Sequence, residues 1–166
     1  MRWNLTRTVT GISFLATMYL SMATPAHAQQ CSAAGVAGGY GFTITGTLIT
    51  GTQLSPTLVP LAAVGKALLR ANGDFSGTEA RSVGGGFANE TLKGTFTVNS
   101  DCMGTLTAEA FEHGELARTS VFSIVFDNDE KEVRAVQESL QLPDGTFVPA
   151  VITVEGKKTF SGDQQN

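Results

Sequence analysis

The sequence predicts an all-β protein that folds as a single eight-stranded antiparallel up-and-down barrel. Apolar and polar residues alternate with period two along most of the chain, which is the pattern of strands that bury one face. Tight-turn signals separate these segments, and glycines within them supply the bends that close a sheet into a barrel. No segment shows a helical stripe. A two-sheet β-sandwich built from the same strands is the alternative.

The clearest expected element is a β-hairpin that spans Leu92–Phe111. In its first arm Phe96 and Val98 alternate with threonines, as expected for a strand with one buried face. The second arm shows the same alternation at Leu106, Ala108 and Ala110. The short polar side chains of Asn99–Cys102 between the arms favour a turn. The bend of this hairpin therefore carries a cysteine.

Six further strands complete the expected barrel. They are predicted at Tyr40–Ile49, Val64–Ala71, Asp74–Val83, Arg118–Asp127, Lys131–Leu140 and Phe147–Thr159. Asn72-Gly73 is a strong two-residue hairpin signal between two of them. The segment Thr50–Ala63 contains Pro56 and Pro60, and we expect it to form a long loop or cap.

The first 28 residues have the three parts of a secretory signal peptide. Arg2 and Arg7 precede an apolar run from Gly11 to Ala23, and the small residues of an expected cleavage site follow and end at Ala28. The run is shorter than the roughly 20 apolar residues that a membrane-spanning helix needs. We therefore expect export to the periplasm or the extracellular space, with no stable membrane insertion after cleavage. The expected organisation is a signal peptide at 1–28, a barrel domain at 29–160 and a disordered tail at 161–166.

Charge excludes two classes of partner. The chain has 11 basic and 15 acidic residues, and removal of the signal peptide makes it more acidic. It has no cluster of Lys and Arg that would bind the phosphate backbone of a nucleic acid. The same absence argues against binding to an anionic membrane surface.

The two cysteines, Cys31 and Cys102, are expected to form a disulfide bond. Paired thiols persist as disulfides in an oxidising compartment, which is where export would place them. A metal site and a redox pair are the alternatives. A tetrahedral zinc site would need further ligands, however, and the chain has no Cys-x-x-Cys motif.

Three groups of residues carry a family resemblance. They are Cys31 followed by Gly39–Phe42, then Gly73–Thr78, and then Lys93–Thr105. With these motifs the chain resembles small exported bacterial proteins whose suspected fold is similar to the allene oxide cyclase and dirigent barrels, within the lipocalin-like set. The resemblance implies a barrel. It does not extend to a catalytic motif of the cyclases.

The candidate ligand-binding residues are aromatic and aliphatic side chains on expected strands, namely Tyr40, Phe42, Ile44, Phe96, Val98 and Phe122. Such a lining suits a pocket for a small apolar molecule. We assign no catalytic, cofactor-binding or metal-ligating residue. Three charged residues in expected strands are candidates for side chains that point into the barrel: Glu109, Arg134 and Glu138. A single bulge in a strand would turn each of them to the opposite face of the sheet.

Two polar clusters are interpreted as ordinary turns. His113 lies in a polar bend and has no evident catalytic partner. Four carboxylates within six positions offer oxygen atoms to Ca²⁺, but their spacing does not match an EF-hand loop, so we predict a plain acidic turn at Asp127, Asp129, Glu130 and Glu132.

Three functions follow as hypotheses. The first is binding of a small apolar ligand inside the barrel. The second is a structural or interaction role, because the expected strand Arg118–Asp127 is apolar on both faces and would offer a surface to a second copy or another partner. The third and weakest is a cyclase or isomerase activity, which only the fold analogy supports.

Overall fold

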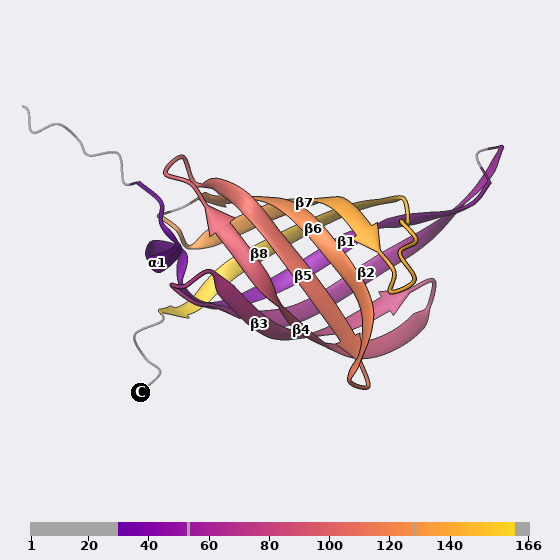
Figure 1. Cartoon of the computed structure of the whole chain (residues 1–166), viewed down its shortest axis with the longest axis horizontal. Coiled ribbons are helices and arrows are strands. Elements are labelled where there is room, and N and C mark those ends of the chain that lie inside the picture. The colour runs from indigo at the N-terminus through magenta and orange to yellow at the C-terminus, as the bar shows by residue number, and fades with distance from the viewer. Residues whose placement is uncertain (1–29, 53, 128, 162–166) are drawn as a thin grey trace, which may run out of the picture.

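The computed structural model describes residues 30–52, 54–127 and 129–161, and it confirms the predicted fold class (Figure 1). The described strands form one closed antiparallel barrel in which each strand pairs with its neighbours in chain order, and the first strand pairs with the last. The expected signal peptide at 1–28 lies outside the described residues, as do positions 162–166 of the expected tail. The first residue of that tail, Ser161, instead ends the last strand. The strands are β1 (Gly38–Thr52), β2 (Ser55–Leu69), β3 (Asp74–Val83), β4 (Gly86–Val98), β5 (Met103–Glu112), β6 (Glu115–Asp127), β7 (Glu132–Gln141) and β8 (Ala150–Ser161).

The prediction of a loop or cap at Thr50–Ala63 is wrong. Its first three residues end β1 and Ser55–Ala63 belong to β2, so the two strands form a long hairpin that extends beyond the barrel (Figure 1). The prolines are tolerated because the pairing of β2 with β3 begins only at Leu61, so the preceding residues lie on a free edge. We call residues 49–60 of this hairpin the arm.

A short helix closes the end of the barrel opposite the arm (Figure 1). The helix α1 (Ala33–Val36) was not predicted from the sequence, because one turn is too short to show a periodic stripe. Ser32 caps its N-terminus by accepting a hydrogen bond from the Gly35 backbone N–H at 3.0 Å. No helix in the described part of the chain is long and apolar enough to cross a membrane.

The predicted disulfide between Cys31 and Cys102 is present. It ties Cys31, which precedes the N-cap residue of α1, to the turn between β4 and β5, with a Cα–Cα distance of 4.9 Å. Because 71 positions separate the two cysteines, the bond closes a large loop and restricts the unfolded chain.

Tyr40 fixes the same helix from inside the barrel. Its hydroxyl lies 2.9 Å from the carbonyl oxygens of both Val36 and Glu130, which joins α1 to the turn between β6 and β7. Burial, together with the Glu130 carboxylate, raises the pKa of Tyr40, so this hydroxyl stays protonated as a donor. Lys158 donates to the carbonyl oxygen of Gly35 at 2.9 Å. Covalent and polar contacts therefore hold α1 in place.

Candidate functional site

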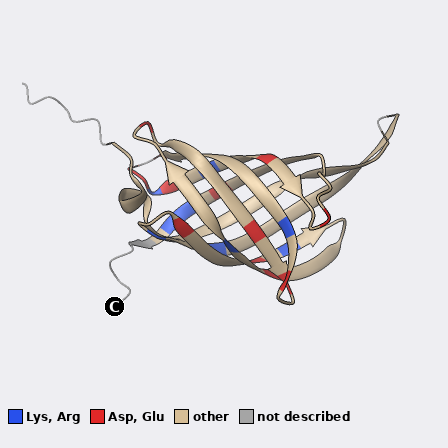
Figure 2. Cartoon of the chain, viewed as in Figure 1, with Lys and Arg blue, Asp and Glu red and all other residues tan. Residues whose placement is uncertain are grey.

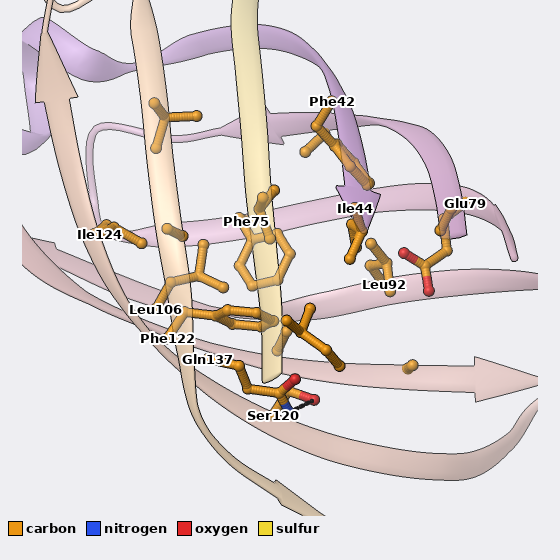
Figure 3. Close-up of a pocket in the computed structure, with 18 of the residues that line it drawn as sticks. Phe42, Ile44, Phe75, Glu79, Leu92, Leu106, Ser120, Phe122, Ile124 and Gln137 are labelled. Atoms are coloured by element: carbon orange, nitrogen blue, oxygen red, sulfur yellow. Dashed lines mark hydrogen bonds between the residues drawn. The ribbon is translucent and has the colours of Figure 1, made fainter. Parts of the chain in front are cut away.

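The interior of the barrel contains a cavity of about 120 Å³ to which all eight strands contribute (Figure 3). Its wall is mostly apolar because inward positions alternate with outward ones along every strand. Aromatic and aliphatic side chains form most of the surface, among them Phe42, Ile44, Phe75, Leu92, Leu106, Phe122 and Ile124.

Four of the six predicted ligand-binding residues line this cavity: Tyr40, Phe42, Ile44 and Phe122. The other two are not among the residues that line it. Phe96 is buried in the core, and Val98 packs against that core. Both belong to the part of β4 that leads to the disulfide-bonded turn, so they support the closed end of the barrel.

Small inward residues leave the space that the cavity occupies. Five alanines contribute to its wall, namely Ala63, Ala67, Ala108, Ala110 and Ala135. Gly65 lets the ring of Phe42 approach the wall, because a Cβ at Gly65 would lie 2.5 Å from Phe42 Cζ. The cavity is therefore a consequence of residue size at inward positions.

A charged cluster lies inside the barrel between the cavity and the end opposite α1. Arg118 on β6 donates to Glu79 Oε1 on β3 and to Glu90 Oε2 on β4, both at 2.5 Å. Arg81 donates to Glu90 Oε1 at 2.7 Å and lies 3.5 Å from Glu112. Since two strands separate β6 from β3, the Arg118 side chain extends through the interior of the barrel.

Both central carboxylates of this cluster are fully enclosed. The side chains of Glu79 and Glu90 are 1% and 0% exposed, whereas those of Arg118 and Arg81 are 17% and 19% exposed. The four residues occur near the turns that join β3 to β4 and β5 to β6, which lie at the end away from α1. The two arginines therefore connect the buried carboxylates with solvent at that end.

The two carboxylates differ in their affinity for a proton. Burial and a hydrogen bond with Glu90 raise the pKa of Glu79 to about 7, although Arg118 acts in the opposite direction. Burial alone would raise the pKa of Glu90 as well, but hydrogen bonds with Arg81, Glu79 and Arg118 lower it to about 2. Near neutral pH, Glu90 is therefore ionised, whereas Glu79 titrates between its protonated and ionised forms.

Two buried side-chain oxygens in the cavity wall lack a hydrogen-bond partner among the described residues. They are Glu79 Oε2 and Gln137 Oε1. The other carboxylate oxygen of Glu79 accepts from Arg118, and the amide nitrogen of Gln137 donates to Ser120 Oγ and to the Ser139 carbonyl. Figure 3 shows the carboxylate of Glu79 pointing toward the apolar side chains of Ile44 and Leu92. These oxygens are the polar features that a bound molecule would meet.

The three charged candidates for inward-facing groups point outward instead. Glu109 is exposed because its neighbours on both sides, Ala108 and Ala110, face the interior. Arg134 is exposed and pairs with Asp127 at the barrel surface. Glu138 lies at a register shift between β6 and β7 and is also exposed.

Sequence reasoning missed the charged cluster although alternation contains a signal for it. Glu79 and Arg81 share the face of Phe75, a buried aromatic residue on β3. In the same way, Glu90 shares the face of Leu92 on β4. Comparing each charged residue with its neighbours two positions away places these groups on the same face as large apolar residues, but it does not show that this face is the inner one.

The polar turns form no metal centre in the described structure. No group of three or more His, Cys, Asp or Glu side chains that could hold a metal ion is present among the described residues. His113 is exposed in the turn between β5 and β6. Glu130, by contrast, is buried and accepts a hydrogen bond from the Ser32 backbone N–H at 3.3 Å. Glu130 therefore helps to hold the residue that precedes α1 in place.

Comparisons with protein-family models, curated proteins and solved structures returned no match. The resemblance to the allene oxide cyclase and dirigent barrels therefore stays a prediction, and so does the cyclase or isomerase activity. The geometry of the barrel interior is what bears on function.

Proposed function

We propose that this protein is an exported binding protein that holds one small, mostly apolar molecule inside its barrel. The apolar cavity of about 120 Å³ carries this proposal. Enclosed cavities lined by aliphatic and aromatic side chains bind small apolar molecules, because a ligand there replaces empty space with van der Waals contacts.

The size of the cavity limits the ligand to about one ring. In another protein, a cavity of roughly 150 Å³ lined by Leu, Ile and Phe stays dry and binds benzene or xenon. A cavity of about 120 Å³ is of the same size class. A long acyl chain exceeds this volume, so we expect compact ligands.

A matched pair of alanine substitutions tests the proposal. Ala63 lines the cavity, whereas its neighbour Ala62 is exposed on the outer face of β2. Ala63→Leu should fill part of the cavity and abolish binding of benzene and methylcyclopentane, measured by ligand-observed NMR. Ala62→Leu makes the same chemical change outside the barrel and should leave binding unchanged. Failure of the wild-type protein to bind either probe would overturn the proposal, and so would equal binding by both variants.

Export is supported by two observations. The first 28 residues have the composition of a signal peptide, and the Cys31–Cys102 disulfide suits an oxidising compartment. Mass spectrometry of the protein from its own host tests this part. A mature chain that begins at Gln29 and carries an intact disulfide is the expected result, whereas an uncleaved chain with free thiols would contradict it.

The arm favours a second candidate function, which is self-association. Residues 43–65 contain no charged side chain, and Figure 2 shows the projecting arm without acidic or basic residues. Leu54 is 99% exposed and Leu58 66% exposed, whereas the expected stripe on β6 is half-buried at Val121 and Val125. An exposed apolar surface of this kind is typical of a protein contact.

Light scattering coupled to size-exclusion chromatography tests self-association through the arm. We expect a dimer or larger oligomer that Leu58→Asp dissociates and that Thr57→Asp, an exposed control on the same strand, leaves intact. A wild-type monomer at high protein concentration would exclude this function.

A further inference from the structure

The polar atoms in the cavity wall restrict the chemistry of its ligand beyond size. Where the cavity meets the charged cluster, Arg118 donates through Nη2 to Glu79 and through Nη1 to Glu90. The unpartnered atoms are both acceptors, Glu79 Oε2 and Gln137 Oε1. An unpartnered buried acceptor destabilises the structure by its lost hydration, and a donor brought by a ligand would restore the missing bond.

We infer that the ligand carries a single neutral hydrogen-bond donor, a hydroxyl or N–H group, which Glu79 Oε2 accepts inside the cavity. This inference rests on the proposed binding function and deepens it. Glu79 is favoured over Gln137 as the acceptor because its carboxylate is charged, and hydrogen bonds to a charged acceptor are the stronger ones. Its side chain is also almost completely enclosed, at 1% exposure.

Charge and hydrogen-bond capacity exclude ionised ligands. A carboxylate or phosphate would lie beside the ionised Glu79, whose negative charge would repel it. An ammonium group has three N–H donors, whereas the buried side chains described in the cavity wall offer two oxygens without a partner, so part of its hydration would be lost without replacement. A hydroxyl group needs only one acceptor, which matches Glu79 Oε2.

Binding of a donor should depend on the protonation of Glu79. The groups that face this carboxylate are Arg118 from β6 and Glu90 from β4, with Arg81 and Glu112 completing the cluster. When Glu79 is protonated, its proton is shared with Glu90, which favours the neutral form. When Glu79 is ionised, its carboxylate carries a full negative charge, so Oε2 accepts more strongly from the ligand. The affinity for a donor should therefore be higher above pH 7 than below it.

Two probes of equal shape separate the hydrogen bond from the apolar contacts. Cyclopentanol and methylcyclopentane differ by a hydroxyl in place of a methyl group, and neither titrates between pH 5 and pH 8. We define the selectivity as the affinity for cyclopentanol divided by that for methylcyclopentane, measured by ligand-observed NMR at pH 8. Glu79→Gln replaces the charged acceptor with an uncharged side chain of equal size. Glu109→Gln makes the same change at an exposed position on β5 and serves as the control.

In the wild-type protein and in Glu109→Gln, the selectivity should fall by roughly tenfold between pH 8 and pH 5, the size expected for loss of a hydrogen bond to a charged acceptor. In Glu79→Gln it should be low at both pH values. The pH comparison needs no variant and stands even if Glu79→Gln does not fold.

Different outcomes refute the two proposals. A selectivity that does not change with pH in the wild-type protein, with methylcyclopentane still bound, would overturn the role of Glu79 and leave the binding function in place. An unchanged selectivity in a folded Glu79→Gln protein would do the same. If the wild-type protein binds neither probe at either pH, the proposed function itself fails.

Discussion

Replacing Glu79 with glutamine should make the protein more stable at pH 8 and leave its stability at pH 5 almost unchanged. Glutamine resembles the protonated form of this residue in size and charge, and its amide oxygen can still accept from Arg118. With a neutral residue at position 79, the two arginines of the cluster are balanced by Glu90 and Glu112. The ionised carboxylate of Glu79 adds a charge that the cluster does not balance.

The magnitude follows from the pKa of Glu79. Burial and the hydrogen bond with Glu90 raise it from 4.5 to about 7, so between these values the folded protein binds a proton that the unfolded chain has released. Stability must therefore fall as the pH rises through this window. At about 1.4 kcal/mol for each pKa unit, the loss approaches roughly 3 kcal/mol. Glu90 acts in a different range, because its pKa of about 2 reduces stability only as the pH falls below 4.5.

Urea denaturation followed by far-ultraviolet circular dichroism measures this effect. The free energy of unfolding is compared at pH 5 and pH 8 for the wild-type protein, Glu79→Gln and the exposed control Glu109→Gln. The control removes one carboxylate without touching the cluster, so it reports the general effect of net charge. The same decrease between pH 5 and pH 8 in all three proteins would refute the assignment of this decrease to Glu79.

Three further substitutions test the fold around the site. Arg118→Met should lower the free energy of unfolding by about 3–5 kcal/mol at pH 8, because it leaves the buried Glu79 without its cation and leaves Glu90 with Arg81 alone. Urea denaturation checks this, and a loss below about 1 kcal/mol would count against it. Cys102→Ala should lower the free energy of unfolding by about 2–4 kcal/mol relative to the oxidised wild-type protein, and it should be as stable as the reduced wild-type protein. Reaction of both thiols in unfolded, unreduced wild-type protein would show that the bond is absent. Tyr40→Phe removes the donor to the Val36 and Glu130 carbonyls, so amide hydrogen exchange in α1 should become faster by about tenfold or more, and unchanged protection would contradict the anchoring role.

Alternation and turn chemistry were enough to predict the barrel. The strand at Asp74–Val83 has the predicted bounds, because Asn72-Gly73 and the glycines after it mark both of its ends. The error at Thr50–Ala63 has a physical cause. Two prolines argue against a strand with neighbours on both sides, but they are compatible with a strand edge that projects beyond the barrel. Single-sequence patterns do not distinguish these situations, since the difference lies in where the neighbouring strand ends.

The cavity and its charged cluster were harder to predict for a different reason. On β3, the inward face carries Phe75, Glu79 and Arg81, and the outward face carries small or weakly polar residues such as Ser76 and Thr78. Neither face is plainly the apolar one, so alternation identifies two faces without showing which is inside. What decides the face is Arg118, more than thirty positions away, whose guanidinium compensates both buried carboxylates. Such a distant compensation leaves no local pattern. Arg118 donates to only one of the two carboxylate oxygens of Glu79. The other oxygen, Oε2, is therefore left as the acceptor on which the proposed ligand recognition depends.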